Sequence, residues 1–159
     1  DQLTTAAATP ADLKAYGNSL AAALQAYPKT DMNETLLAVS NAVDTGTPES
    51  VKPFADIQRE HSALTSDLLM MPVPEILLPL HLQVLNNFVR ITDLYADFAQ
   101  ISTDPLRGIS ALKLYQSLVL ETQRLLTNVA RALNESGILF TSDEPGHVWS
   151  LLLTLDNNR

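Results

Sequence analysis

One segment of this chain, residues 104–137, carries a complete set of signals for a single long helix. Asp104 is a suitable N-cap, because its carboxylate accepts from the free backbone N–H groups of the first turn. Pro105 fits the first helical position, where its missing N–H costs nothing. Gly137 can adopt the positive φ that ends a helix, and Ile138 supplies the apolar contact that follows. Between these ends, apolar residues recur at the spacing of one helical face: Leu106, Ile109, Leu112, Leu118 or Val119, Leu125 or Leu126, Val129 and Leu133.

The length of this helix constrains the fold. The span from Pro105 to Ser136 holds 32 residues, which is about 48 Å at ~1.5 Å per residue. In a chain of 159 residues, a helix of that length buries its apolar face by packing along other helices. The segment therefore predicts a helical bundle. No residue pattern on the helix itself indicates chemistry.

The rest of the chain repeats one arrangement, in which a small polar residue and a proline precede an amphipathic run. The predicted helices are 10–27, 31–44, 48–70, 74–101, 105–136 and a short final helix at 148–155. Pro79 either kinks the fourth of these or marks its true first turn. The helix at 31–44 either continues a broken stave or lies across one end. The final segment, 148–155, could instead form a strand, since a short run of leucines suits either structure.

The apolar period is helical throughout, and no convincing pair of β-strands is visible. We therefore predict an all-α fold, an antiparallel helical bundle of four long helices plus one or two short ones. The long helices are 10–27, 48–70, 74–101 and 105–136. Residues 10–155 form a single domain, residues 1–9 a flexible N-terminal linker, and residues 156–159 a frayed polar tail.

Composition excludes several classes of function. The net charge of −8 argues against nucleic-acid binding, which needs clustered Lys and Arg, and against docking on anionic lipid. The chain has no cysteine, which excludes disulfides, thiolate metal sites and cysteine nucleophiles. No apolar run approaches the ~20 residues of a membrane-spanning helix, so we predict no transmembrane segment in this chain.

The opening residues predict where the protein works. Residues 1–9 are mostly small, like the linkers that often follow a cleaved signal peptide or a membrane anchor. This pattern favours an extracytoplasmic protein, whether periplasmic, at the cell surface or secreted. The other interpretation is that the chain was simply cut at this point.

Metal-binding patterns typical of helical bundles are missing from the sequence. The di-iron type needs a Glu and a Glu-x-x-His motif from paired helices. Here Glu121 is followed three residues later by Arg124, and the single Glu-x-x-His, Glu144 to His147, contains Pro145 and Gly146 and has no counterpart on a second helix. The three histidines, His61, His81 and His147, have no histidine partner four residues away. We therefore predict no metal and no cofactor.

Candidate catalytic groups are sparse. His61 and His81 each stand alone on an apolar stripe, which is typical of a core-edge histidine with one hydrogen bond. Asp93 and Asp97 are like charges four residues apart, and close carboxylates can act as acid and base. The acidity of the surface explains them equally well. An enzyme would require one of these histidines to meet one of these aspartates within hydrogen-bond reach, and we predict no catalytic residue.

A set of short motifs resembles a pattern in uncharacterised α-helical proteins of bacteria with very small genomes. Those proteins are predicted to be exported or anchored by an N-terminal segment, and some are encoded near pilus or secretion components. The resemblance covers residues 70–125 and implies a helical fold and a cell-envelope location, with no catalytic residue to carry over. His81 and Asn86 would make either a structural contact between helices or a functional one. The motifs are Pro72-Val73-Pro74, Leu80-His81-Leu82, Leu85-Asn86, Asp104-Pro105 and Tyr115.

Two functions follow as hypotheses. The first is a non-enzymatic, extracytoplasmic bundle that acts through a protein partner or self-association, such as a subunit or accessory part of a cell-surface or secretion assembly. The alternative is a carrier of a small apolar ligand or lipid in a cavity between helices, lined by Leu, Met and Phe. An internal cavity above ~300 Å³ would favour the carrier.

Overall fold

A computed structural model of the chain describes residues 4–6, 8–27 and 32–156. It confirms an all-α helical bundle. The described helices are α1 Pro10–Ala26, α2 Met32–Thr45, α3 Pro48–Met70, α4 Leu78–Phe98, α5 Pro105–Glu135 and α6 His147–Asp156. The predicted tail beyond Asp156, and positions 1–3 and 7 of the predicted linker, lie outside the described residues.

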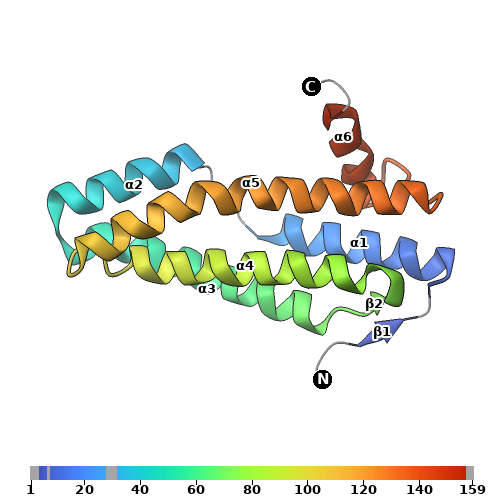
Figure 1. Cartoon of the computed structure of the whole chain (residues 1–159), viewed down its shortest axis with the longest axis horizontal. Coiled ribbons are helices and arrows are strands. Elements are labelled where there is room, and N and C mark those ends of the chain that lie inside the picture. Colours follow the sequence, from blue (N-terminus) through green and yellow to red (C-terminus); the bar gives the residue numbers. More distant parts are fainter. Residues whose placement is uncertain (1–3, 7, 28–31, 157–159) are drawn as a thin grey trace.

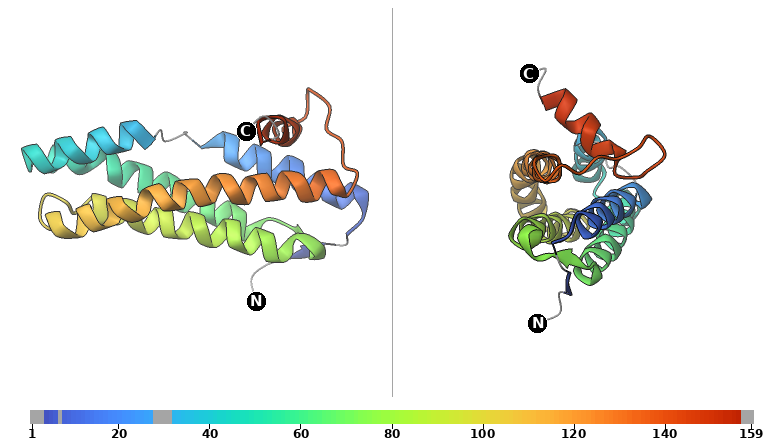
Figure 2. Two further views of the ribbon diagram at one scale, coloured as in Figure 1. Left: turned by 45° about the horizontal axis from the view of Figure 1, so that its top comes forward. Right: turned by 90° about the vertical axis from the view of Figure 1, so that its right-hand side faces the viewer.

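The helices lie along one long axis. Figure 1 shows α3, α4 and α5 side by side along it, with the chain turning back between α4 and α5. Helices α1 and α2 follow one another along the same axis, so together they form one broken stave (Figures 1 and 2). This arrangement decides between the two positions predicted for the helix at 31–44. Helix α6 crosses α5 instead of running along it, and it packs mainly against that helix.

The helix ends follow local signals in the sequence. Thr9 begins α1 with a capping box, and Asp104 caps α5 by accepting from the backbone N–H of Arg107 at 3.1 Å. Gly46 and Gly137 have φ of +60° and +73°, the left-handed conformation that ends α2 and α5. These ends agree with the predicted bounds to within one or two residues because each depends on neighbours in the sequence.

The predicted helix 74–101 is too long at both ends. Val73–Pro74 is a short strand, β2, and Glu75–Leu77 is a turn of 3₁₀ helix. Helix α4 starts only at Leu78, with Pro79 in its first turn, and ends at Phe98. Pro79 has no N–H to donate to an earlier carbonyl, so the α-helix cannot extend further toward the N-terminus. Pro79 therefore lies in the first turn of α4 and does not kink the helix.

A strand pair that the sequence analysis did not predict ties the N-terminal segment to the bundle. Strand β1, Thr5–Ala6, pairs in parallel with β2, so that Thr5 lies opposite Val73 and Ala6 opposite Pro74. The Val73 N–H also donates to the Thr4 carbonyl at 2.9 Å. Two-residue strands are too short to show alternation, which is why the sequence carries no signal for them.

Aromatic rings fill the centre of the bundle. Phe54, Phe98, Tyr95 and Tyr115 are almost fully buried, and the centroids of the last three rings lie within 5.7–5.8 Å of one another. Two of their hydroxyls form a closed triangle with Thr35 of α2. The oxygens of Tyr95 and Tyr115 are 2.9 Å apart, and each lies 3.2 Å from the Thr35 hydroxyl. This contact fixes α2 against α4 and α5 in the absence of a long shared interface.

The connection before α6 is folded onto α1. The Trp149 indole N–H donates to the Gly17 carbonyl at 2.9 Å, and the Gly146 N–H donates to the Asn18 side-chain oxygen at 2.9 Å. Glu144 accepts from the Thr141 backbone N–H at 2.7 Å and pairs with a lysine of α1 at 2.9 Å. These contacts, with the Thr141 bond first, lower the pKa of Glu144 to about 2. They hold α6 at a fixed place over the bundle.

Candidate ligand pocket

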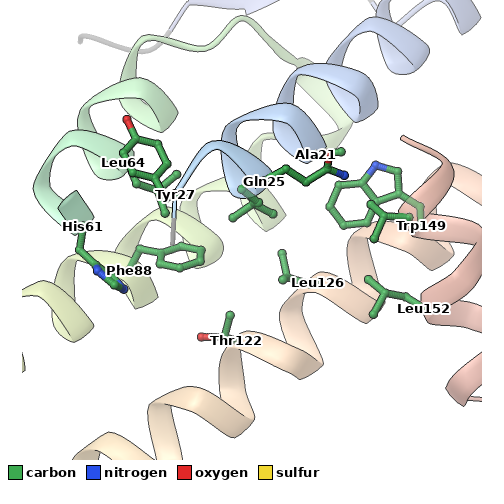
Figure 3. Close-up of a pocket in the computed structure, with 12 residues that line it drawn as sticks. Ala21, Gln25, Tyr27, His61, Leu64, Phe88, Thr122, Leu126, Trp149 and Leu152 are labelled. Atoms are coloured by element: carbon green, nitrogen blue, oxygen red, sulfur yellow. The ribbon is translucent and has the colours of Figure 1, made fainter. Parts of the chain in front are cut away.

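An apolar pocket opens where α6 crosses the bundle (Figure 3). Its volume is about 460 Å³, and α1, α3, α4, α5 and α6 all contribute to its wall. A second space of about 310 Å³ lies next to it toward Tyr115. We call the two spaces the large lobe and the small lobe of one pocket. Both are lined by the same central residues: His61, Phe88, Thr122, Leu126 and Leu152.

Helical spacing brings the lining residues of the large lobe to its wall. Residues three or four apart share a helix face. Each helix therefore contributes a short set of lining residues. The sets are Ala21, Leu24 and Gln25 of α1, with Tyr27 just after it; His61 and Leu64 of α3; Phe88 of α4; Thr122 and Leu126 of α5; and Val148, Trp149 and Leu152 of α6. The pocket remains open because α6 crosses α5 at an angle. The side chains of α6 therefore cover the space without interdigitating with the other helices along its length.

His61 is a buried polar group in this wall. Its side chain on α3 is only 9% exposed, and its ring packs near Tyr95 and Phe88 at centroid distances of 5.2 and 6.5 Å. Its Nδ1 lies 3.1 Å from the carbonyl of Ile57, and Nε2 has no hydrogen-bond partner among the described residues. Burial lowers the pKa of His61, while the Ile57 bond and the nearby Glu60 oppose that shift. The prediction of one hydrogen bond holds for this histidine.

The other polar groups of the lining are engaged or exposed. Thr122 donates to the Leu118 carbonyl at 2.9 Å and accepts from the Asn87 amide at 2.7 Å. Gln25 and Gln123 are exposed at the rim. Nε2 of His61 is therefore the acceptor in the lining that has no hydrogen-bond partner among the described residues.

His81 is more deeply embedded than predicted. Its side chain is 0% exposed and makes two hydrogen bonds, where the sequence predicted a core-edge position and one. The Tyr16 hydroxyl donates to Nδ1 at 3.1 Å, and the Nε2–H donates to the Leu68 carbonyl at 3.0 Å. With both ring nitrogens satisfied, His81 joins α1, α3 and α4 and has no free atom for a ligand. Burial lowers its pKa.

The acidic pair predicted as a candidate does not meet a histidine. Asp97 accepts from the Arg107 side chain at 2.6 Å, and Asp93 is exposed on α4. The hydrogen bonds described above for His61 and His81 involve backbone carbonyls and a tyrosine, and neither involves an aspartate. Within residues 4–6, 8–27 and 32–156, no group of three or more His, Asp or Glu side chains is placed to hold a metal ion.

Comparisons with protein-family models, with curated proteins and with solved structures found no match. The resemblance based on short motifs between residues 70 and 125 stays a prediction. In the described part of the chain, none of the helices combines the length and the apolar character needed to cross a bilayer. The functional interpretation therefore depends on the geometry of the pocket.

Proposed function

We propose that this protein binds a small apolar molecule in the pocket beneath α6. The observation that carries the proposal is the large lobe of about 460 Å³, walled by side chains from α1, α3, α4, α5 and α6. Protein interiors are normally packed as densely as organic crystals. A space of this size falls in the range of small-molecule sites. It opens to solvent, so it is a cleft and not the internal cavity of more than ~300 Å³ set above as favouring a carrier.

The chemistry of the wall supports an apolar ligand. Phe88, Leu126, Leu152 and the Trp149 ring present carbon surface to the large lobe, as Figure 3 shows. Each buried CH₂ group of a ligand contributes about 0.8 kcal/mol. An eight-carbon chain would therefore gain roughly 6 kcal/mol from burial, before the cost of losing its free motion.

The direct test uses the neutral apolar dye N-phenyl-1-naphthylamine, whose fluorescence rises in an apolar site. Trp149 is the chain's one tryptophan and lines the large lobe. The fluorescence of the bound dye should therefore rise, and the dye should quench the Trp149 emission by energy transfer. The two signals should follow one binding curve. Dye that brightens without quenching Trp149 would place its site elsewhere and contradict the proposal.

A matched pair of variants locates the site. Leu126→Trp adds a large ring to the wall of both lobes and should weaken dye binding at least tenfold. Leu120→Trp makes the same change on the same helix at a side chain that is 58% exposed and lines neither lobe. It should leave dye binding unchanged. Because both variants add a second tryptophan, dye emission excited directly is the signal to compare. Equal dye affinities for the two variants would count against the pocket.

Exposed apolar side chains favour protein contact as a second candidate function. Leu106, Ile109 and Leu120 fall on one face of α5 and are 78%, 43% and 58% exposed. We propose that this face binds a protein partner or a second copy of the chain. Light scattering during size exclusion, with and without Leu106→Lys, tests self-association, and a pulldown from the source cell tests a partner. A strict monomer without a partner would contradict this candidate.

The extracytoplasmic location, and membership of a cell-surface or secretion assembly, remain part of the proposal. Their support is the motif resemblance over residues 70–125. Fractionation of the source cell with an antibody against this protein tests the location. Recovery in the cytoplasmic fraction alone would contradict it.

A further inference from the structure

We infer that the pocket selects a neutral aliphatic molecule with a hydrogen-bond donor at its head, such as an alcohol, whose O–H donates to Nε2 of His61. This inference rests on the proposed function, because it names the class of ligand that the same pocket takes. It follows from the state of one ring nitrogen, the charge of the wall and the position of His61 between the lobes.

The first step concerns the proton on the His61 ring. Nδ1 lies 3.1 Å from the Ile57 carbonyl, which can only accept, so Nδ1 carries the proton and donates. In the neutral ring, Nε2 is then an acceptor. Burial lowers the pKa of His61, which keeps the ring neutral at pH 7.5. A ligand group that donates a hydrogen bond matches Nε2, whereas an ether or a carboxylate offers only another acceptor.

The second step concerns charge. Among the described residues, those that line the two lobes include no Lys, Arg, Asp or Glu. A carboxylate or an ammonium group in this wall would lose its hydration without meeting an opposite charge, and that loss is costly. The composition of the wall therefore disfavours fatty acids in their ionised form as well as amines. A neutral head group avoids the penalty.

The third step concerns position. His61 lines both lobes, so its ring lies where they meet. Figure 3 shows it beside Phe88, at the end of the large lobe opposite Trp149. A head group on Nε2 therefore leaves the hydrocarbon chain running through the large lobe toward α6. The His61 residue is only 9% exposed, and a hydrocarbon chain that fills the lobe would cover more of it, which limits competition from water for the acceptor.

The experiment compares two constitutional isomers of similar length, of which only one has a hydrogen-bond donor. Octan-1-ol and heptyl methyl ether have the same atoms, but the ether has no O–H. Each displaces N-phenyl-1-naphthylamine from the full chain at pH 7.5, and octanoate forms the third arm. We expect octan-1-ol to bind roughly tenfold more tightly than the ether, which is about 1.4 kcal/mol. Octanoate should bind no better than the ether.

Two variants assign the difference to an atom. His61→Phe keeps an aromatic ring but has no acceptor, so it should bind the alcohol and the ether equally. Thr122→Val removes a part-buried hydroxyl that both lobes share and should keep the tenfold preference, because that hydroxyl is already engaged with Asn87 and the Leu118 carbonyl. Loss of the preference in Thr122→Val, with its retention in His61→Phe, would overturn the inference.

The outcomes separate this inference from the proposed function. Equal displacement of the dye by octan-1-ol, the ether and octanoate would overturn the donor preference while the pocket still bound apolar ligands. Absence of dye binding would overturn both. The comparison of isomers uses the unaltered chain, so it decides the inference even where His61→Phe fails to fold.

Discussion

Gly17→Ala tests whether the connection before α6 lies on α1 as described. Gly17 is in the middle of α1, a position where alanine normally stabilises a helix by up to ~1 kcal/mol. Here a methyl group at Gly17 would lie 2.6 Å from the tip of the Phe140 ring and 3.1 Å from a methyl of Leu133. The substitution therefore places an atom where the tertiary structure has no room.

The magnitude follows from two opposing effects. Overpacking of a filled site costs about 1–3 kcal/mol, and the gain in helix propensity offsets up to ~1 kcal/mol of it. The expected net loss is about 1 kcal/mol, which is a fall in Tm of ~2–4 °C for a domain of this size. In a Phe140→Leu background the ring tip is gone, so Gly17→Ala should instead stabilise by ~0.5 kcal/mol.

Urea unfolding followed by circular dichroism measures all four corners of this double-mutant cycle. The predicted coupling between Gly17 and Phe140 is about 1.5 kcal/mol, well above the few tenths expected of distant sites. A Gly17→Ala variant more stable than the parent would refute the placement of Phe140 against α1. The result bears on the pocket as well, because the same connection carries the α6 residues that roof it.

Two further predictions concern buried polar groups. Burial lowers the pKa of both His61 and His81, so the unfolded chain binds more protons below their ordinary pKa near 6.5. These histidines contribute fully to stability above that pH, and the contribution is lost as the pH falls toward 5. Equal urea midpoints at pH 7.5 and at pH 5 would contradict this. Tyr115→Phe should cost about 1–2 kcal/mol, because it breaks the hydroxyl triangle with Thr35 and Tyr95. Thr35→Val combined with it should cost less than the sum of the two single changes, and strict additivity in urea titrations would argue against the triangle.

The helices were predictable wherever their limits depend on neighbours in the sequence. Pro48 and Pro105 each fit a first helical turn, and Gly137 fits a helix end, because these residues restrict or permit backbone angles locally. The apolar stripes indicated the buried face over most of each run, but Leu106 and Ile109 of the stripe predicted for 105–136 are 78% and 43% exposed, because no other described helix covers them. Where a limit depended on a distant partner the prediction was wrong, as at Pro74, which was expected to begin a helix but pairs with Ala6 in a short strand.

The pocket was beyond sequence reasoning for a related reason. Leu126 and Trp149 appear in the sequence as ordinary core residues, and nothing in their spacing distinguishes a filled interior from a hollow one. Whether a space remains depends on the angle at which α6 crosses α5, and that angle is set by contacts such as Trp149 with the Gly17 carbonyl.

The order of residues alone therefore determined that this chain forms long amphipathic helices, because helix propensity, capping and periodicity act over a few neighbouring positions. Only the tertiary structure decided that these helices form a pocket, and that one nitrogen of His61 in its wall has no hydrogen-bond partner in the described part of the chain. Both features depend on how side chains far apart in the sequence meet, and packing in three dimensions sets those distances.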